Sequence, residues 1–223
     1  MIKAYAEMIK DISGDNPEKR NEHLDVIINE TEYLDKLVID MLEYSKMQAG
    51  YIELTKSNVE LAKIVKKVLK TLKNLIDEKN IKVTHKLDDV VVYCDEVKIT
   101  QVINNFITNA VKYTDNNGKI EILLKDLEEE VRFDVIDNGK GIKEEEIPYI
   151  WDRYYKIDKN FSRNMNSFGL GLAIAKAILE AHHAKYGVAS KVGEGSNFYF
   201  IIKKVKLLGS LDLMVLVRAQ QLR

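Results

Sequence analysis

Residues 101–114 read QVINNFITNAVKYT and lie within a helix predicted from Glu96 to Tyr113. Asn105, Asn109 and Lys112 fall on one narrow stripe of that helix at 100° per residue. A solvated face would explain one such residue, but an asparagine costs a helix about half a kcal/mol relative to alanine. Amide oxygens beside a lysine suit a polyphosphate that carries Mg²⁺, because this ion takes few side-chain ligands. The opposite face is apolar and is expected in the core; it carries Ile99, Val102, Ile103, Phe106, Ile107 and Ala110.

Two glycine-containing segments are candidates for the rest of a nucleotide pocket. Residues 137–141, DNGKG, follow an apolar strand, where glycines let the backbone approach a flat ligand and Asp137 can accept a hydrogen bond from an exocyclic amine. Asn-Gly is also a common hairpin turn. Residues 168–172, FGLGL, open an apolar helix whose first N–H groups can bind phosphate. Neither segment completes the dinucleotide-binding Gly-x-Gly-x-x-Gly pattern, and the chain has no P-loop.

Composition limits the class of protein further. Of the 223 residues, 46% are hydrophobic and 31% are charged, which is typical of a soluble globular protein. Lys+Arg 34 against Asp+Glu 35 gives a net charge of -1, so no basic field predicts a nucleic-acid partner. Cys94 is the one cysteine and cannot close an internal disulfide, which suits a reducing cytosol. No apolar run approaches the ~18 residues of a membrane helix, and the start lacks a signal-peptide core. We expect a soluble, cytoplasmic chain.

The first fifty residues predict two helices, over 2–12 and from Pro17 to about residue 49. Asn16 and Pro17 are typical of a helix start. His23 is expected on the surface of the second helix, and no histidine stands at metal spacing from cysteine or carboxylates. A regular seam favours bundle or dimer packing over a helix that packs only on its own domain. Its members are Leu24, Ile27, Thr31, Leu34, Val38, Met41, Ser45 and Gln48.

Beyond Gly50 the pattern changes to mixed strands and helices. Strands are predicted at 51–56, 81–87, 90–94, 119–127 and 130–137, with two more around the turn at 193–195. Helices are predicted at 59–78, 96–113, 144–154 and 169–182. Without strict βαβ alternation, this order favours an α+β two-layer sandwich, a mixed sheet packed on helices. The predicted division is a helical pair (1–49), the sandwich domain (50–204) and a tail of unknown origin (205–223).

Five motifs together resemble those of sensor histidine kinases. Residues 101–114 resemble the N box, 137–142 the G1 box, 150–158 the F box and 168–174 the G2 box, and 193–198 (GEGSNF) resemble the closing Gly-x-Gly-Ser/Thr-x-Phe signature. The helical pair resembles the dimerisation and histidine-phosphotransfer hairpin, cut off within its first helix. The resemblance implies the ATP-binding fold shared with gyrase, MutL and heat-shock chaperones.

The resemblance implies metal and phosphate contacts for five side chains. Asn105 would ligate Mg²⁺, and Asn109 and Lys112 would hold phosphates of ATP. Arg153 or Lys156 would reach the γ-phosphate, and residues 159–167 would form a lid over it.

The resemblance also implies an adenine site. Tyr113 would lie against the nucleotide, Asp137 would accept the adenine amino proton and Ser196 would support it. Room for the base and the phosphates would come from the backbone at Gly139, Gly141, Gly169, Leu170 and Gly171. Two departures from the family pattern are Ser167 in place of a glycine and residues 182–184, HHA, in place of His-Gly-Gly.

Gln101 selects between reactions. In hydrolytic relatives, a glutamate one turn before the metal-binding asparagine activates water, and an amide cannot take that proton. The expected activity is therefore that of an ATP-dependent protein-histidine kinase, which relays phosphate to a response regulator receiver domain in two-component signal transduction. The family's acceptor box is expected just before Ile2, so this fragment alone is not expected to autophosphorylate. The parent protein is expected to be membrane-anchored and homodimeric through the hairpin.

Alternatives remain open at this point. A nucleotide-binding regulatory module would bind ATP without phosphorylating histidine, and the long heptad helix argues against it. A hydrolytic relative of the same fold is disfavoured by Gln101. A purely structural protein would not need five motifs in register.

Overall fold

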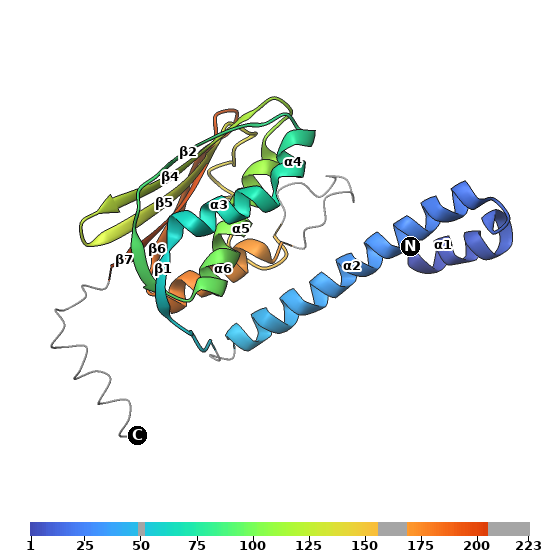
Figure 1. Ribbon diagram of the computed structural model, residues 1–223, viewed down its shortest axis with the longest axis horizontal. Coiled ribbons are helices and arrows are strands. Elements are labelled where there is room, and N and C mark those ends of the chain that lie inside the picture. Colours follow the sequence, from blue (N-terminus) through green and yellow to red (C-terminus); the bar gives the residue numbers. More distant parts are fainter. Residues whose placement is uncertain (49–51, 156–168, 205–223) are drawn as a thin grey trace, which may run out of the picture.

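The computed structural model describes residues 1–48, 52–155 and 169–204, which form a helical hairpin and an α+β sandwich (Figure 1). Helix α1 (Ile2–Met8) continues into a π-helical turn (Ile9–Ser13), and the long helix α2 spans Pro17–Gln48. The predicted start of α2 is confirmed, since Asn16 Oδ1 accepts hydrogen bonds from the N–H groups of Glu18 and Lys19, both at 3.1 Å. Among the described residues, no helix is long and apolar enough to cross a membrane.

His23 is not the surface residue that we expected. The hairpin brings its half-buried ring within 5.3 Å of the Tyr5 ring and its Nδ1 within 3.0 Å of Ser13 Oγ. A contact between two helices is not visible in the pattern of either helix alone, which explains the error.

A five-stranded mixed sheet forms one layer of the sandwich (Figure 1). Its order is β2 (Lys82–Leu87), β4 (Lys119–Leu127), β5 (Glu130–Asp137), β7 (Gly195–Lys203) and β6 (Lys185–Lys191), and only β2 and β4 pair in parallel. The second layer consists of the helices α3 (Leu61–Thr71), α4 (Lys73–Glu78), α5 (Glu96–Tyr113) and α6 (Gly171–Ala181). The predicted α+β two-layer sandwich is confirmed.

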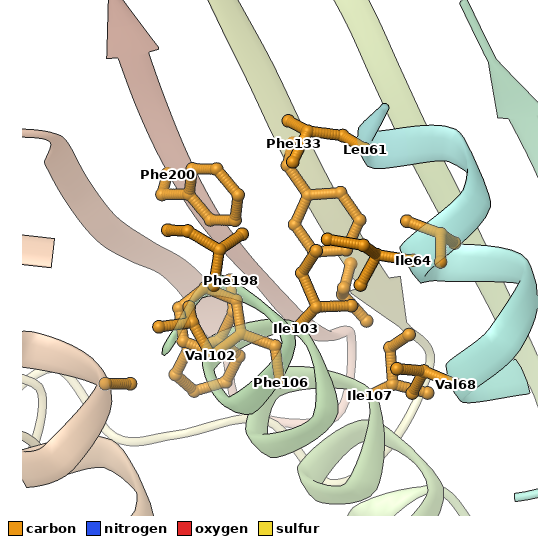
Figure 2. Close-up of a cluster of buried hydrophobic side chains, with 14 of the residues drawn as sticks. Leu61, Ile64, Val68, Val102, Ile103, Phe106, Ile107, Phe133, Phe198 and Phe200 are labelled. Atoms are coloured by element: carbon orange, nitrogen blue, oxygen red, sulfur yellow. The ribbon is translucent and has the colours of Figure 1, made fainter. Parts of the chain in front are cut away.

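The core lies between these two layers. Figure 2 shows side chains of α5 and α3 facing the phenylalanines of β5 and β7. Phe106 of α5 is fully buried, and its ring lies 5.6 Å from that of Phe198 and 6.5 Å from that of Phe200. All six apolar residues predicted for the core face of α5 are at most 1% exposed. Because this face is fixed by the core, the polar stripe of α5 has a fixed direction as well.

Three predicted elements differ from the structure. The strand predicted at 51–56 lies instead at β1 (Ser57–Glu60), where it pairs antiparallel with β3 (Val91–Cys94); residues 52–56 have no regular structure and residue 51 is outside the described residues. The helix predicted at 59–78 begins after β1 and is divided at Leu72 into α3 and α4. The helix predicted at 144–154 is a series of turns, because Pro148 lacks an N–H group and disfavours a helical residue before it.

Candidate nucleotide-binding site

The polar stripe of α5 lies beside the first turn of α6. Asn105, Asn109 and Lys112 are all half-buried at the edge of the core. Asn105 Nδ2 donates a hydrogen bond to the carbonyl oxygen of Gly171, the first residue of α6, at 2.9 Å. A Cβ at position 171 would lie only 3.3 Å from Asn105 Oδ1. The structure therefore brings the proposed metal ligand and the G2 segment together, and glycine leaves room for the amide oxygen.

The N-terminus of α6 is an anion site by geometry. Its N-cap residue is Leu170, whose side chain is 2% exposed and makes no cap hydrogen bond. The first N–H groups of this 11-residue helix are thus not used by a side-chain cap, and the helix dipole favours negative charge there. Gly169 has φ +71, and a Cβ there would lie 2.8 Å from the carbonyl oxygen of Tyr155. Leu170 can serve the site only through its backbone.

Asp137 lies at the end of β5 and is 5% exposed. Its Oδ1 accepts a hydrogen bond from Gly139 N–H at 2.9 Å, and the Ser196 N–H is a second backbone donor. Burial raises the pKa of Asp137, and the two N–H groups offset part of that increase. A buried carboxylate held by backbone donors is well suited to accept a hydrogen bond from an exocyclic amine.

The turn after Asp137 contacts the end of α5. A Cβ at Gly139 would lie 2.3 Å from the carbonyl oxygen of Tyr113, so only glycine allows this approach. Lys112 Nζ lies 4.9 Å from the centre of the Tyr113 ring. The phosphate-side and adenine-side candidates therefore share one corner of the structure.

Ser190 is a site residue that the sequence analysis missed. Its Oγ accepts a hydrogen bond from Ile142 N–H at 2.9 Å, donates to the carbonyl oxygen of Gly195 at 2.8 Å and lies 2.9 Å from Ser196 Oγ. This hydroxyl joins the segment after Gly141 to the β6–β7 turn. The signal in the sequence is its position opposite Ser196 in the antiparallel pair, which becomes visible only once the register is known.

Arg153 and Gln101 contact the long helix in this structure. The Arg153 guanidinium lies 4.7 Å from the centre of the Tyr44 ring, and Gln101 Nε2 donates to Glu43 Oε2 at 2.9 Å. Lys98 Nζ donates to the other oxygen of Glu43 at 3.1 Å. Burial alone would raise the pKa of Glu43, but the hydrogen bonds from Gln101 and Lys98 bring it below its ordinary value. Lys156, Ser167 and the predicted lid at 159–167 lie outside the described residues.

Known proteins share both parts of this architecture. Residues 94–206 match the histidine kinase-, DNA gyrase B- and HSP90-like ATPase family, and residues 1–50 match the His Kinase A (phospho-acceptor) domain. The sensor protein kinase WalK of Staphylococcus saprophyticus is 30% identical over 203 residues, which are 90% of this chain and 33% of WalK. The chain thus spans about a third of the length of that curated relative.

Solved structures agree with these matches. Full-length ShkA in complex with AMPPNP has a TM-score of 0.74 at 25% identity, over 85% of this chain and 40% of ShkA. The histidine kinase ThkA in complex with the response regulator protein TrrA has a TM-score of 0.72 at 29% identity, over 92% of this chain and 57% of that one. Fold and site define an ATP-binding domain of the histidine kinase-, gyrase- and HSP90-like class. Within that class, the chain belongs to the sensor histidine kinases.

Proposed function

We propose that this chain binds ATP with Mg²⁺ and transfers the γ-phosphate to a histidine of a phospho-acceptor hairpin, from which a response regulator receiver domain takes it. The observation that carries the proposal is the hydrogen bond between Asn105 and Gly171, which joins the amide that we assign to the metal ion to the N-terminus of α6. The buried Asp137 carboxylate at the end of β5 supports adenine as the base. The AMPPNP bound to ShkA and the regulator bound to ThkA support the same assignment.

The donor set fits a magnesium ion that arrives with the nucleotide. Mg²⁺ prefers oxygen ligands and keeps several of them as water and phosphate, so the single amide oxygen of Asn105 is sufficient. Among the described residues, no group of three His, Cys, Asp or Glu side chains could hold the ion without a nucleotide. When bound, the ion supplies positive charge at the phosphates.

The protein's own contribution is positioning and charge. Lys112 and the N–H groups of α6 favour the negative charge of the phosphates, and Asn109 lies between Lys112 and Asn105 on the same stripe. Gln101 cannot accept a proton, and its amide is engaged by Glu43. The site therefore favours transfer of the phosphoryl group to an approaching side chain and disfavours the activation of water.

The proposal includes a homodimer through the hairpin. Along α2, Leu34, Val38 and Met41 of the predicted seam are 46%, 54% and 45% exposed. Apolar side chains at heptad spacing are stabilised when a second helix covers them, and a second copy offers the same seam. The proposal also places this part of the sensor in the cytoplasm, with the membrane anchor outside the chain.

The test uses this chain together with a separate hairpin domain that carries the family's acceptor box with its histidine. Labelled ATP with Mg²⁺ should give an acid-labile phosphohistidine on the hairpin, and substitution of its histidine should abolish the label. Nucleotide binding without any transfer would instead support a regulatory module. Steady ATP turnover in the absence of the hairpin would support a hydrolytic enzyme.

A further inference from the structure

Lys79 makes an unusual set of contacts just outside the candidate site. It is the C-cap residue of α4, and its Nζ lies 2.8 Å from the carbonyl oxygen of Val111, 2.9 Å from that of Lys112 and 2.8 Å from that of Thr114. An ammonium group carries three protons, so all of its donors are matched by acceptors on one helix end. Lys79 belongs to none of the five motifs.

We infer that Lys79 is a positioning residue for the nucleotide site, because it holds the last turn of α5, from which Lys112 and Tyr113 reach the nucleotide. The inference rests on the function proposed above. It adds a residue that touches no ligand and acts through the backbone of the helix that does.

The end of α5 needs such a partner. The last carbonyl oxygens of a helix lack N–H donors within the helix, and a glycine in the left-handed conformation often closes the helix end by supplying them. Here the C-cap residue is Thr114 in an extended conformation, at φ -79 and ψ 134. The Lys79 cation satisfies the Val111 and Lys112 oxygens instead and complements the negative end of the helix dipole.

The surrounding contacts show that this end of α5 is held from two sides. On one side, Asn117 N–H donates to the Lys79 carbonyl oxygen at 2.9 Å, which ties the turn after α5 to the same segment. On the other side, the Tyr113 carbonyl oxygen meets Gly139, where a Cβ would approach to 2.3 Å. Gly139 is in turn bonded to Asp137, whose Oδ1 accepts a hydrogen bond from Gly139 N–H. Loss of the Lys79 contacts would therefore free the phosphate-side residues relative to the adenine-side carboxylate.

The decisive variant is Lys79→Met, which keeps an unbranched side chain of similar length and removes all three donors. We expect the Kd for ATP with Mg²⁺, measured by calorimetry well below the melting temperature, to rise about fivefold or more. The KM for ATP in transfer to the hairpin should rise in parallel, while turnover at saturating ATP stays within about twofold, because bound nucleotide restores the position of the helix end. A merely structural role would lower the melting temperature and the active fraction without changing Kd.

Two further variants complete the test. Lys73→Met alters an exposed lysine on the same short helix and should leave Kd unchanged. Lys79→Arg keeps the charge, but its planar fork cannot match three converging carbonyl oxygens, so Kd should rise about twofold to threefold. If Lys79→Met does not fold, the arginine variant decides, and an unchanged Kd overturns the inference. A folded Lys79→Met protein with the Kd of the unmodified protein also overturns it. Absence of ATP binding by the unmodified protein would instead refute the proposed function.

Discussion

Replacement of Asp137 by asparagine tests the adenine site with almost no change in shape. The carboxylate is 5% exposed and accepts N–H groups of Gly139 and Ser196. In Asp137→Asn, the single amide oxygen is drawn to these two donors. The NH₂ group then points at the position from which an adenine amine would donate, and two donors face each other.

The expected loss follows from the charge and the burial of the group. A hydrogen bond to a charged partner contributes about 1.5 to 3 kcal/mol, which corresponds to a roughly 10-fold to 100-fold rise in the Kd for ATP. The substitution Asp137→Asn should not destabilise the folded state. Because burial raises the pKa of Asp137 in the folded state, the folded protein binds this proton more tightly than the unfolded chain does. The contribution of Asp137 to the free energy of unfolding therefore falls as the pH rises from the pKa of the unfolded chain through the raised pKa of the folded protein. The buried carboxylate then destabilises the folded state, and the neutral amide of asparagine removes this destabilisation at pH 7.

Calorimetric titrations with ATP and with ITP, each with Mg²⁺, provide the assay. ITP carries an oxygen where ATP carries the amino group, so the unmodified protein should bind ATP at least about tenfold more tightly. Asp137→Asn should lose most of this preference, while its melting temperature without nucleotide should be unchanged or higher. ATP binding by the unmodified protein should also weaken as the pH falls through the raised pKa of Asp137, and the variant should lack this dependence. An unchanged ATP/ITP ratio in the folded variant would refute the reasoning.

Three further substitutions test other parts of the structure. Gly171→Ala places a Cβ 3.3 Å from Asn105 Oδ1, so the affinity for ATP should fall about threefold in calorimetric titrations with Mg²⁺ and by a smaller factor in titrations without it. Equal losses of affinity with and without Mg²⁺ would argue against the metal role of Asn105. His183 is exposed and has φ +54, so His183→Gly should raise the free energy of unfolding by roughly 0.5 to 1 kcal/mol in urea titrations, and a decrease would contradict the strain argument. Phe106→Ala should lower that free energy by about 3 to 5 kcal/mol in the same titrations, and a loss below about 1 kcal/mol would contradict the assigned core.

Strong local patterns allowed the central helix to be predicted from the sequence. The bounds of α5 agree with the prediction, because its apolar face has a clear helical period and Asp95 caps its start, with its side chain accepting from Lys98 N–H at 3.0 Å. The bounds of β4 and β5 also agree, since β4 alternates between buried and more exposed residues from Lys119 to Leu124, and both strands lie next to clear turns. The same periodicity placed Asn105, Asn109 and Lys112 on one side of α5.

Long-range contacts account for what the sequence could not predict. Strand β1 depends on its pairing with β3, for example Ser57 with Cys94, and no local pattern reveals such a partner. Ser190 and Lys79 each contact a backbone atom of a distant segment, so their residue types carry no motif. The contact between Glu43 and Gln101 joins the long helix to the sandwich and depends on how these two parts pack.

Titration of the folded protein with ATP, with and without Mg²⁺, tests the account most directly. The arrangement of Asn105, Gly171 and Asp137 predicts saturable heat and a higher melting temperature with ATP, both clearly larger when Mg²⁺ is present. Folded protein that shows neither heat nor thermal protection at millimolar ATP with Mg²⁺ would contradict the account.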